Sequence, residues 1–224
     1  ESGNVSKIPI ADTLRFHWRE VLVAIGAKVV ETAPFYIFGT FIVSYGTSNL
    51  NYSETSVLYS VMFATIVTTI LIPIMGALSD KVGRKPLYIW GTVLMILYAF
   101  PYFWLIHQGS ITLLVIATII GLGVIWAPIT AVLGTMFSEI FSAKVRYTGI
   151  SLGYQIGAAV AGGTAPLVAT ALLIRFNDSY VPVAIYIIFT ALISLVSILA
   201  MKGRRTEELD DGIVEVEDEL IANK

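Results

Sequence analysis

The chain has 224 residues, of which 56% are hydrophobic and only 13% are charged, with a formal net charge of -2 and a mean hydropathy of +0.80. A soluble domain carries about 25% charged residues, so this composition excludes an ordinary soluble fold and predicts an integral membrane protein. Cysteine is absent and the two histidines lie far apart, so we expect no disulfide, thiolate chemistry, metal or cofactor. We also expect no nucleic-acid partner; the expected surroundings are the lipid bilayer.

Six apolar stretches follow one another along the chain, at about residues 21–46, 56–78, 87–106, 111–136, 148–174 and 181–201. Each is near or above the roughly 20 residues that a helix needs to cross a bilayer. We therefore predict an all-α bundle of six transmembrane helices over 21–201, after a polar cytoplasmic lead-in (1–20) and before an acidic cytoplasmic tail (202–224). The first residue is Glu1 rather than Met, which suggests a fragment or a processed product.

Basic residues near the span ends predict the orientation, because Lys and Arg concentrate on the cytoplasmic side. Along the chain, Lys and Arg residues occur before the first span and after the second, fourth and sixth spans. The connections on the other side of the membrane contain only one, Arg175. The sequence therefore predicts a multi-pass protein of the cell (inner or plasma) membrane with both termini cytoplasmic. The residues that carry this bias are Lys7, Arg15, Arg19, Lys81, Arg84, Lys85, Lys144, Arg146, Lys202, Arg204 and Arg205.

The connection between the second and third spans carries the most specific motif, Gly-Ala-Leu-Ser-Asp-Lys-Val-Gly-Arg-Lys over residues 76–85. Its glycines predict close approach and a sharp turn, and its acid can accept hydrogen bonds from Arg84 or from the next helix start. The motif resembles the signature loop of the major facilitator superfamily, G-x-L-x-D-[RK]-x-G-[RK]-[RK]. The matching positions are Gly76, Leu78, Asp80, Lys81, Gly83, Arg84 and Lys85.

Full transporters of this superfamily have two six-span bundles, so the resemblance implies that about half is missing. Residues 138–149 and 151–155 look like the region around span eleven of the metabolite:proton symporter family, and residues 17–20 and 35–46 look like span seven. This resemblance covers about 14–205 and implies the C-terminal half of the fold, with 3+3 inverted repeats. It also implies a missing N-terminal six-helix half as partner, and a small-molecule substrate with a proton.

Matched prolines are consistent with such repeats. Pro34 and Pro128 lie at similar depths in spans one and four, and Pro73 and Pro166 in spans two and five. Proline is common in membrane helices, so the alternative is that the matched positions do not reflect a repeat.

Two charged residues stand inside the first span, Lys28 and Glu31. Counting from Val21 at 1.5 Å per residue, Glu31 lies about 15 Å deep, near the bilayer midplane. A charge at that depth is costly unless it is paired or hydrated, and the i,i+3 spacing allows the two residues to pair. The pattern predicts that Glu31 moves protons while Lys28 tunes its protonation or attracts an anionic substrate. The alternative is a static pair that only fixes packing.

Other candidate substrate- or proton-binding residues extend the same helix face or lie on neighbouring spans. Phe35 and Tyr45 continue the stripe of Glu31, together with Phe38 and Ile42. Trp126 beside Pro128 offers an aromatic wall, and either Tyr154 or Gln155 could reach the cavity.

The fifth span also has a small-residue face, which predicts close approach by another helix. Its members are Gly149, Gly153, Gly157 and Ala161. Trp104, Tyr102 and Tyr180 are interpreted as interfacial residues of the membrane surface.

Two acid–base sets lie on the predicted cytoplasmic side, Asp80 with Arg84 and Lys85, and Glu139 with Arg146. The resemblance implies that such clusters are gating latches, which hold helix ends together in one transport state. The alternative is a set of surface ion pairs of little energetic value.

These features favour secondary active transport of a small polar metabolite, an organic acid or a zwitterion, by proton-coupled symport with alternating access. The spans contain no cysteine, no histidine at depth and no paired carboxylates, so we expect no enzyme and no catalytic residues. The alternative is a non-transporting six-helix scaffold or a self-associating half-transporter.

Overall fold

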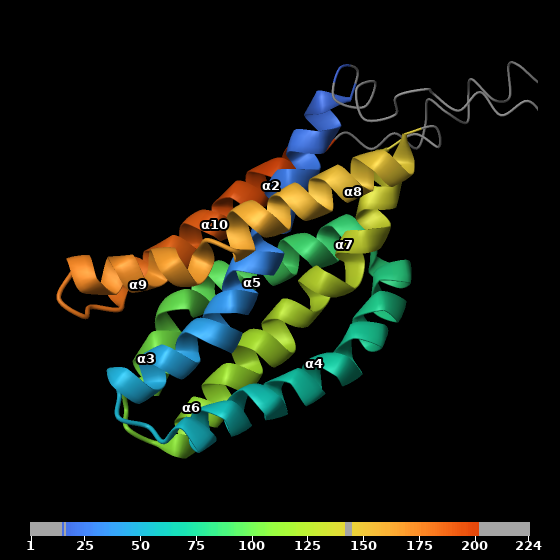
Figure 1. Cartoon of the computed structure of the whole chain (residues 1–224). Helices are drawn as coiled ribbons and strands as arrows, with labels where there is room; N and C mark the ends of the chain where they lie inside the picture. Colours follow the sequence, from blue (N-terminus) through green and yellow to red (C-terminus); the bar gives the residue numbers. More distant parts are fainter. Residues whose placement is uncertain (1–14, 16, 142–144, 202–224) are drawn as a thin grey trace, which may run out of the picture.

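A computed structural model describes residues 15, 17–141 and 145–201. The predicted tail, 202–224, and most of the predicted lead-in lie outside these residues, so the predicted domain boundaries stay predictions. All elements of the described chain are helical (Figure 1). They are α2 (Trp18–Tyr36), the π-helix η1 (Ile37–Phe41), α3 (Ile42–Ser48), α4 (Glu54–Val82), α5 (Arg84–Ile106), α6 (Ile111–Thr118), η2 (Ile119–Ile125), α7 (Trp126–Ile140), α8 (Arg146–Gly157), η3 (Ala158–Gly162), α9 (Ala165–Arg175) and α10 (Val181–Ala200).

These elements join into six helices that are long and apolar enough to cross a membrane, at Trp18–Ser48, Glu54–Val82, Arg84–Ile106, Ile111–Ile140, Arg146–Arg175 and Val181–Ala200. The predicted six-helix fold is confirmed. The main difference lies in the motif over 76–85, because the helices run almost through it. Only Gly83 separates α4 from α5, with φ 93° and ψ 145°, a conformation that glycine adopts without strain.

Gly76 does not serve the close approach that we expected of it, since a Cβ added there would meet nothing within 4 Å. The single-residue turn at Gly83 places Lys81 in the last turn of α4 and Arg84 in the first turn of α5. The charged motif is therefore presented on two helix ends rather than on a flexible loop.

Three of the six spans contain a π-helical segment, and two of these segments end within one helical turn before a proline. Proline lacks an N–H group, and its ring crowds the carbonyl group four residues earlier. The carbonyl four residues before Pro128 belongs to Val124 in η2, and the one before Pro166 belongs to Gly162 in η3. Pro34 lies just before η1, whereas Pro73 lies inside the uninterrupted α4. The matched prolines therefore do not share one local structure, because a π-helical segment follows Pro34 but precedes Pro128, and one precedes Pro166 but none accompanies Pro73.

The first span is the centre of the bundle, and the second lies at its edge. In Figure 1, α2 lies against α8 and α10, while α4 runs along the opposite side beside α6 and α7. In the most apolar stretch of each span, 67% of the first span's residues are buried, against 11% of the second span's. The central position of α2 explains why its charged residues are enclosed by protein.

The predicted small-residue face of the fifth span is confirmed as a packing surface, with Gly153 and Gly157 against α2 and Gly149 against Phe141. A Cβ added to Gly153 would lie 2.5 Å from the Ala24 Cβ, and one added to Gly157 would lie 2.6 Å from the Lys28 Cβ. Side-chain atoms do not approach so closely, so glycine is required where α8 crosses α2.

The interpretation of Tyr102 as an interfacial residue is wrong. Its side chain is fully buried, and its ring centre lies 4.5 Å from that of Phe38. Trp104, on the same helix, is largely exposed. One aromatic residue of the pair therefore faces the bundle and the other faces outward, which the tertiary packing of α5 decides.

Candidate functional site

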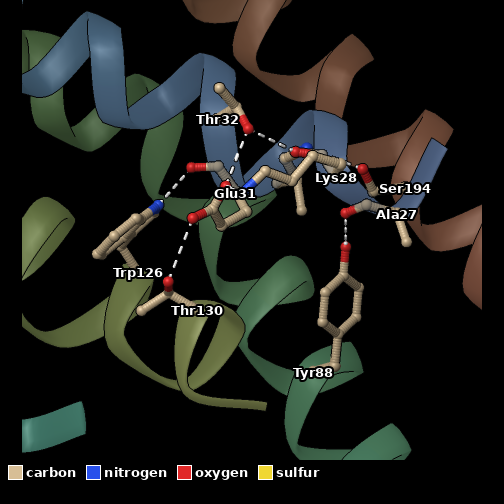
Figure 2. A network of polar contacts seen from close by, with 9 residues as sticks. Ala27, Lys28, Glu31, Thr32, Tyr88, Trp126, Thr130 and Ser194 are labelled. Carbon is tan, nitrogen blue, oxygen red and sulfur yellow. Dashed lines mark hydrogen bonds and ion pairs between the residues drawn. The ribbon is translucent and has the colours of Figure 1, made fainter. Parts of the chain in front are cut away.

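Lys28 and Glu31 form a buried ion pair in the middle of α2. Their residue exposures are 3% and 7%, and Lys28 Nζ lies 2.5 Å from Glu31 Oε2. The i,i+3 spacing places both side chains on one face of the helix, which Figure 2 shows turned toward α7. The pairing predicted from the sequence is thus present in the structure.

Two threonine hydroxyls complete the surroundings of the Glu31 carboxylate. Thr32 donates to Oε2 at 2.9 Å, and Thr130 of α7 donates to Oε1 at 3.2 Å. Both carboxylate oxygens therefore have partners, as a buried carboxylate requires. Sequence reasoning missed these two threonines. For Thr130, the available signal was its position one helical turn after the predicted site residue Trp126.

The Lys28 ammonium has a second partner on the small-residue helix. Its Nζ lies 3.5 Å from the ring centre of Tyr154, a cation–π arrangement. Gly157, one turn further along α8, allows the approach that places this ring beside α2. The predicted residue Tyr154 therefore joins the site, whereas Gln155, the next residue, is exposed.

Trp126 also joins the site, through the backbone of α2. Its Nε1 donates to the carbonyl of Glu31 at 2.5 Å (Figure 2), and its ring centre lies 5.1 Å from that of Phe35. Phe35 is partly exposed, at 39%. The two rings form an aromatic wall beside the charged pair, made from α2 and α7.

Tyr45 is not brought to this site. It lies roughly 20 Å further along the helix axis than Glu31, at 1.5 Å per residue. Its hydroxyl lies 3.0 Å from His107 Nε2, while His107 Nδ1 donates to the carbonyl of Phe103 at 2.6 Å. The ring of Tyr180 lies tilted beside His107, with ring centres 4.5 Å apart. Tyr45 thus belongs to a cluster at the end of the bundle opposite Arg84.

The second charged set lies where α4, α5 and α7 meet at the other end. Arg84 forms a charged hydrogen bond with Glu139, and its Nη2 lies 3.7 Å from Asp80 Oδ1. Lys85 Nζ donates to the carbonyl of Met201 at 3.0 Å. These residues border a polar cavity of about 420 Å³.

The predicted pairing of Glu139 with Arg146 is wrong. Glu139 pairs with Arg84 across the helices, whereas Arg146 Nε donates to the carbonyl of Phe141 at 3.4 Å. The reason is geometric: α7 ends beside α5, which brings Glu139 to the signature motif, while Arg146 opens α8. Within the described ranges, no cluster of three or more His, Cys, Asp or Glu side chains could hold a metal ion.

The six-helix bundle, the buried ion pair in its first span and the charged motif on two helix ends agree with the resemblance found in the sequence. The family model "Major Facilitator Superfamily" matches residues 25–219. The chain belongs to the Major Facilitator Superfamily, which is a family of transporters rather than enzymes.

Relatives of known description support the narrower resemblance. The chain is 32% identical over 196 residues to the shikimate transporter of Escherichia coli (strain K12), covering 88% of this chain and 45% of the relative. It is 33% identical over 193 residues to the glycine betaine/proline/ectoine/pipecolic acid transporter OusA of Dickeya dadantii, covering 86% and 38%. It is 28% identical over 170 residues to the citrate-proton symporter of Klebsiella pneumoniae, covering 76% and 38%.

The chain spans less than half the length of these relatives. No solved structure matches it significantly.

Proposed function

We propose that the chain is the C-terminal half of a transporter that carries a small polar metabolite, an organic acid or a zwitterion, together with a proton by alternating access. The observation that carries this proposal is the buried Lys28–Glu31 pair beside the partly exposed aromatic wall of Phe35 and Trp126. Ionisable groups at membrane depth mark substrate and proton pathways. A first six-helix half completes the cavity, in keeping with the share of the relatives that this chain covers.

In this proposal, Glu31 accepts the proton and Lys28 receives the substrate. While Glu31 is ionised, its carboxylate forms an ion pair with the Lys28 ammonium, with Oε2 and Nζ 2.5 Å apart. Protonation removes the charge of Glu31, and Lys28 then has no anionic partner within the turn. A substrate carboxylate takes that place, so proton and substrate bind together. Tyr154 holds the ammonium in position throughout.

The charged set of Asp80, Arg84, Lys85 and Glu139 is proposed as the gating latch. It ties the ends of α4, α5 and α7 together with groups that stay in contact with water. Such pairs contribute little net stability, so they can separate at small cost when the helix ends move. Arg146 is proposed to take part through the start of α8, beside the end of α7.

The latch end is proposed to face the cytoplasm. In this orientation the protein lies in the cell membrane with both termini on the cytoplasmic side. A cysteine introduced at Ser110, between the third and fourth spans, should react with an impermeant maleimide from outside. A cysteine at Ser142, which lies outside the described residues, should react only from inside. The reverse pattern would refute the orientation.

The deciding experiment uses the complete transporter, this chain together with its first half, in membrane vesicles. Glu31→Gln should abolish substrate accumulation driven by a pH gradient but preserve exchange of substrate across pre-loaded vesicles. Replacing both charged residues, Lys28→Met with Glu31→Gln, should not restore accumulation. Normal accumulation by Glu31→Gln would assign the pair to structure and move the proton site elsewhere.

A second candidate is self-association of this half as a scaffold, which the exposed α4 favours, since only 11% of its most apolar stretch is buried. Cysteines at Thr65 and Thr69, two exposed positions one turn apart on that helix, should then crosslink between copies. Without crosslinks in the membrane, this alternative fails.

A further inference from the structure

The turn of α2 that carries Lys28 and Glu31 is held by side chains that bond to its backbone. Three other helices supply them: Tyr88 of α5 donates to the carbonyl of Ala27 at 2.5 Å, Trp126 of α7 donates to the carbonyl of Glu31 at 2.5 Å, and Ser194 belongs to α10. Within an α-helix these backbone groups ordinarily bond to one another. Contacts from three other helices therefore act directly on the backbone of this one turn.

Ser194 has the most unusual arrangement of the three. Its Oγ accepts a hydrogen bond from the amide of Val30 at 2.8 Å and donates to the carbonyl of Gly26 at 2.6 Å. Gly26 and Val30 are the i and i+4 groups that a regular helix joins directly. A hydroxyl can bridge them because it both donates and accepts. Figure 2 draws Ser194 beside the backbone of this turn, opposite the side from which Trp126 approaches.

Packing brings the serine close enough to do this. Ser194 and Val30 are both fully buried, and a Cβ at Gly26 would collide with the side chain of Ser197 on the same α10 helix. The absence of a side chain at Gly26 therefore admits α10 to the backbone of α2. Side chains that insert into the internal bonds of a helix are a recognised cause of bending.

Stability alone does not account for this serine. If the hydroxyl were absent, the amide of Val30 and the carbonyl of Gly26 could bond to each other, so neither group would be left without a partner. Hydrogen bonds between membrane helices also contribute little on average. The hydroxyl instead ties the backbone of this turn to α10, and the turn carries both charges.

We propose that Ser194 is a positioning residue, which fixes the backbone of the turn from Gly26 to Val30 so that Glu31, the next residue, is kept within reach of Lys28 and Thr130 together. The inference rests on the proposed role of Glu31 as the proton-binding group. Helix α10 thereby acts on the charged pair through the backbone of α2.

Several groups around Glu31 can influence its protonation. The charged or titratable ones are Lys28 on α2, Tyr88 on α5 and Tyr154 on α8. The neighbours from α7 and α10 in this network, Trp126, Thr130 and Ser194, carry no charge. Loss of the serine bridge is expected to let the turn shift away from α10 and weaken the pair with Lys28, which favours protonated Glu31.

The test measures this protonation without transport, in the chain reconstituted in liposomes. Dicyclohexylcarbodiimide reacts with protonated carboxyl groups in apolar surroundings, and peptide mass spectrometry quantifies its adduct on Glu31 across pH. Ser194→Ala should raise the labelling rate near neutral pH by about threefold or more, the effect expected for one hydrogen bond. Ser194→Thr, which keeps the hydroxyl, should label as the parent does.

The matched control is Ser197→Ala on the same face of α10, because the Ser197 hydroxyl donates to its own helix, at the carbonyl of Ile193. It should leave the rate unchanged. A Ser194→Ala rate within twofold of the parent, or equal effects of both variants, would overturn the inference. If Ser194→Ala does not fold, Ser194→Cys takes its place, with the same direction expected because a thiol is a weak donor. No labelling of Glu31 in the parent at any pH would instead count against the proposed proton site.

Discussion

The two charged sets of this protein have the same chemistry in opposite surroundings. The side chains of Lys28 and Glu31 are 4% and 9% exposed, whereas those of Arg84 and Glu139 are 33% and 52% exposed and that of Asp80 is 69% exposed. Water screens the second set, and each of its members can be solvated alone. The first set is enclosed by protein, so neither residue is solvated when it loses its partner, and the two residues depend on each other.

This difference in exposure separates what each set can do. A solvated pair can open and close with little change in free energy, which suits a contact that forms in one transport state only. A buried pair changes only when a proton or a substrate replaces one of its members. The predictions below test this contrast, from the largest expected effect to the smallest.

The largest effect is expected from breaking the buried pair on one side. Lys28→Met leaves the Glu31 carboxylate without its cation and should lower the free energy of unfolding by about 3–5 kcal/mol. The double variant Lys28→Met with Glu31→Gln should recover most of this loss. Denaturant titration in mixed micelles, followed by tryptophan fluorescence, measures both. Equal stability of the single and double variants would contradict the mutual dependence of the pair.

A smaller effect is expected from disturbing the buried pair through packing alone. Gly157→Ala places a Cβ 2.6 Å from the Lys28 Cβ and should cost about 1–3 kcal/mol of stability, the usual range for overpacking. Gly134→Ala is the matched control, because nothing lies within 4 Å of its added Cβ. The same unfolding assay applies, and a destabilisation common to both variants would show that the α2–α8 crossing is not the cause.

At the exposed set, we expect a functional effect with little change in stability. Asp80→Asn removes the ionic contact with Arg84 at 3.7 Å and should change the free energy of unfolding by about 1 kcal/mol or less. Uptake by the complete transporter should nevertheless slow strongly, with equal amounts of protein in the vesicles. Unchanged uptake would remove Asp80 from the latch.

The smallest effect concerns salt. A double-mutant cycle between Arg84 and Glu139, with Arg84→Gln and Glu139→Gln, should give a coupling energy of about 1 kcal/mol or less that falls as the salt concentration rises. The cycle between Lys28 and Glu31 should give a larger coupling that is insensitive to salt. Similar salt dependence in both cycles would mean that burial does not distinguish the two sets.

The sequence by itself determined the features that depend on local spacing. Apolar length predicted the six spans to within a few residues, because a bilayer imposes a minimum helix length on each. The pairing of Lys28 with Glu31 was predictable because residues three apart share a helix face. The signature motif, with Gly83 as its turn, was recognisable because its residues stand at fixed spacings within ten consecutive positions.

Tertiary structure alone decided which helix faces meet. Thr130, Tyr154 and Ser194 are distant from Glu31 in the sequence and reach its turn only because α7, α8 and α10 surround α2. Glu139 was predicted to pair with Arg146, which is nearer in sequence, yet α7 carries it to Arg84. Spacing along the chain predicts contacts within one helix. Contacts between helices depend on the rotation of each of the six spans about its axis and on which faces pack together.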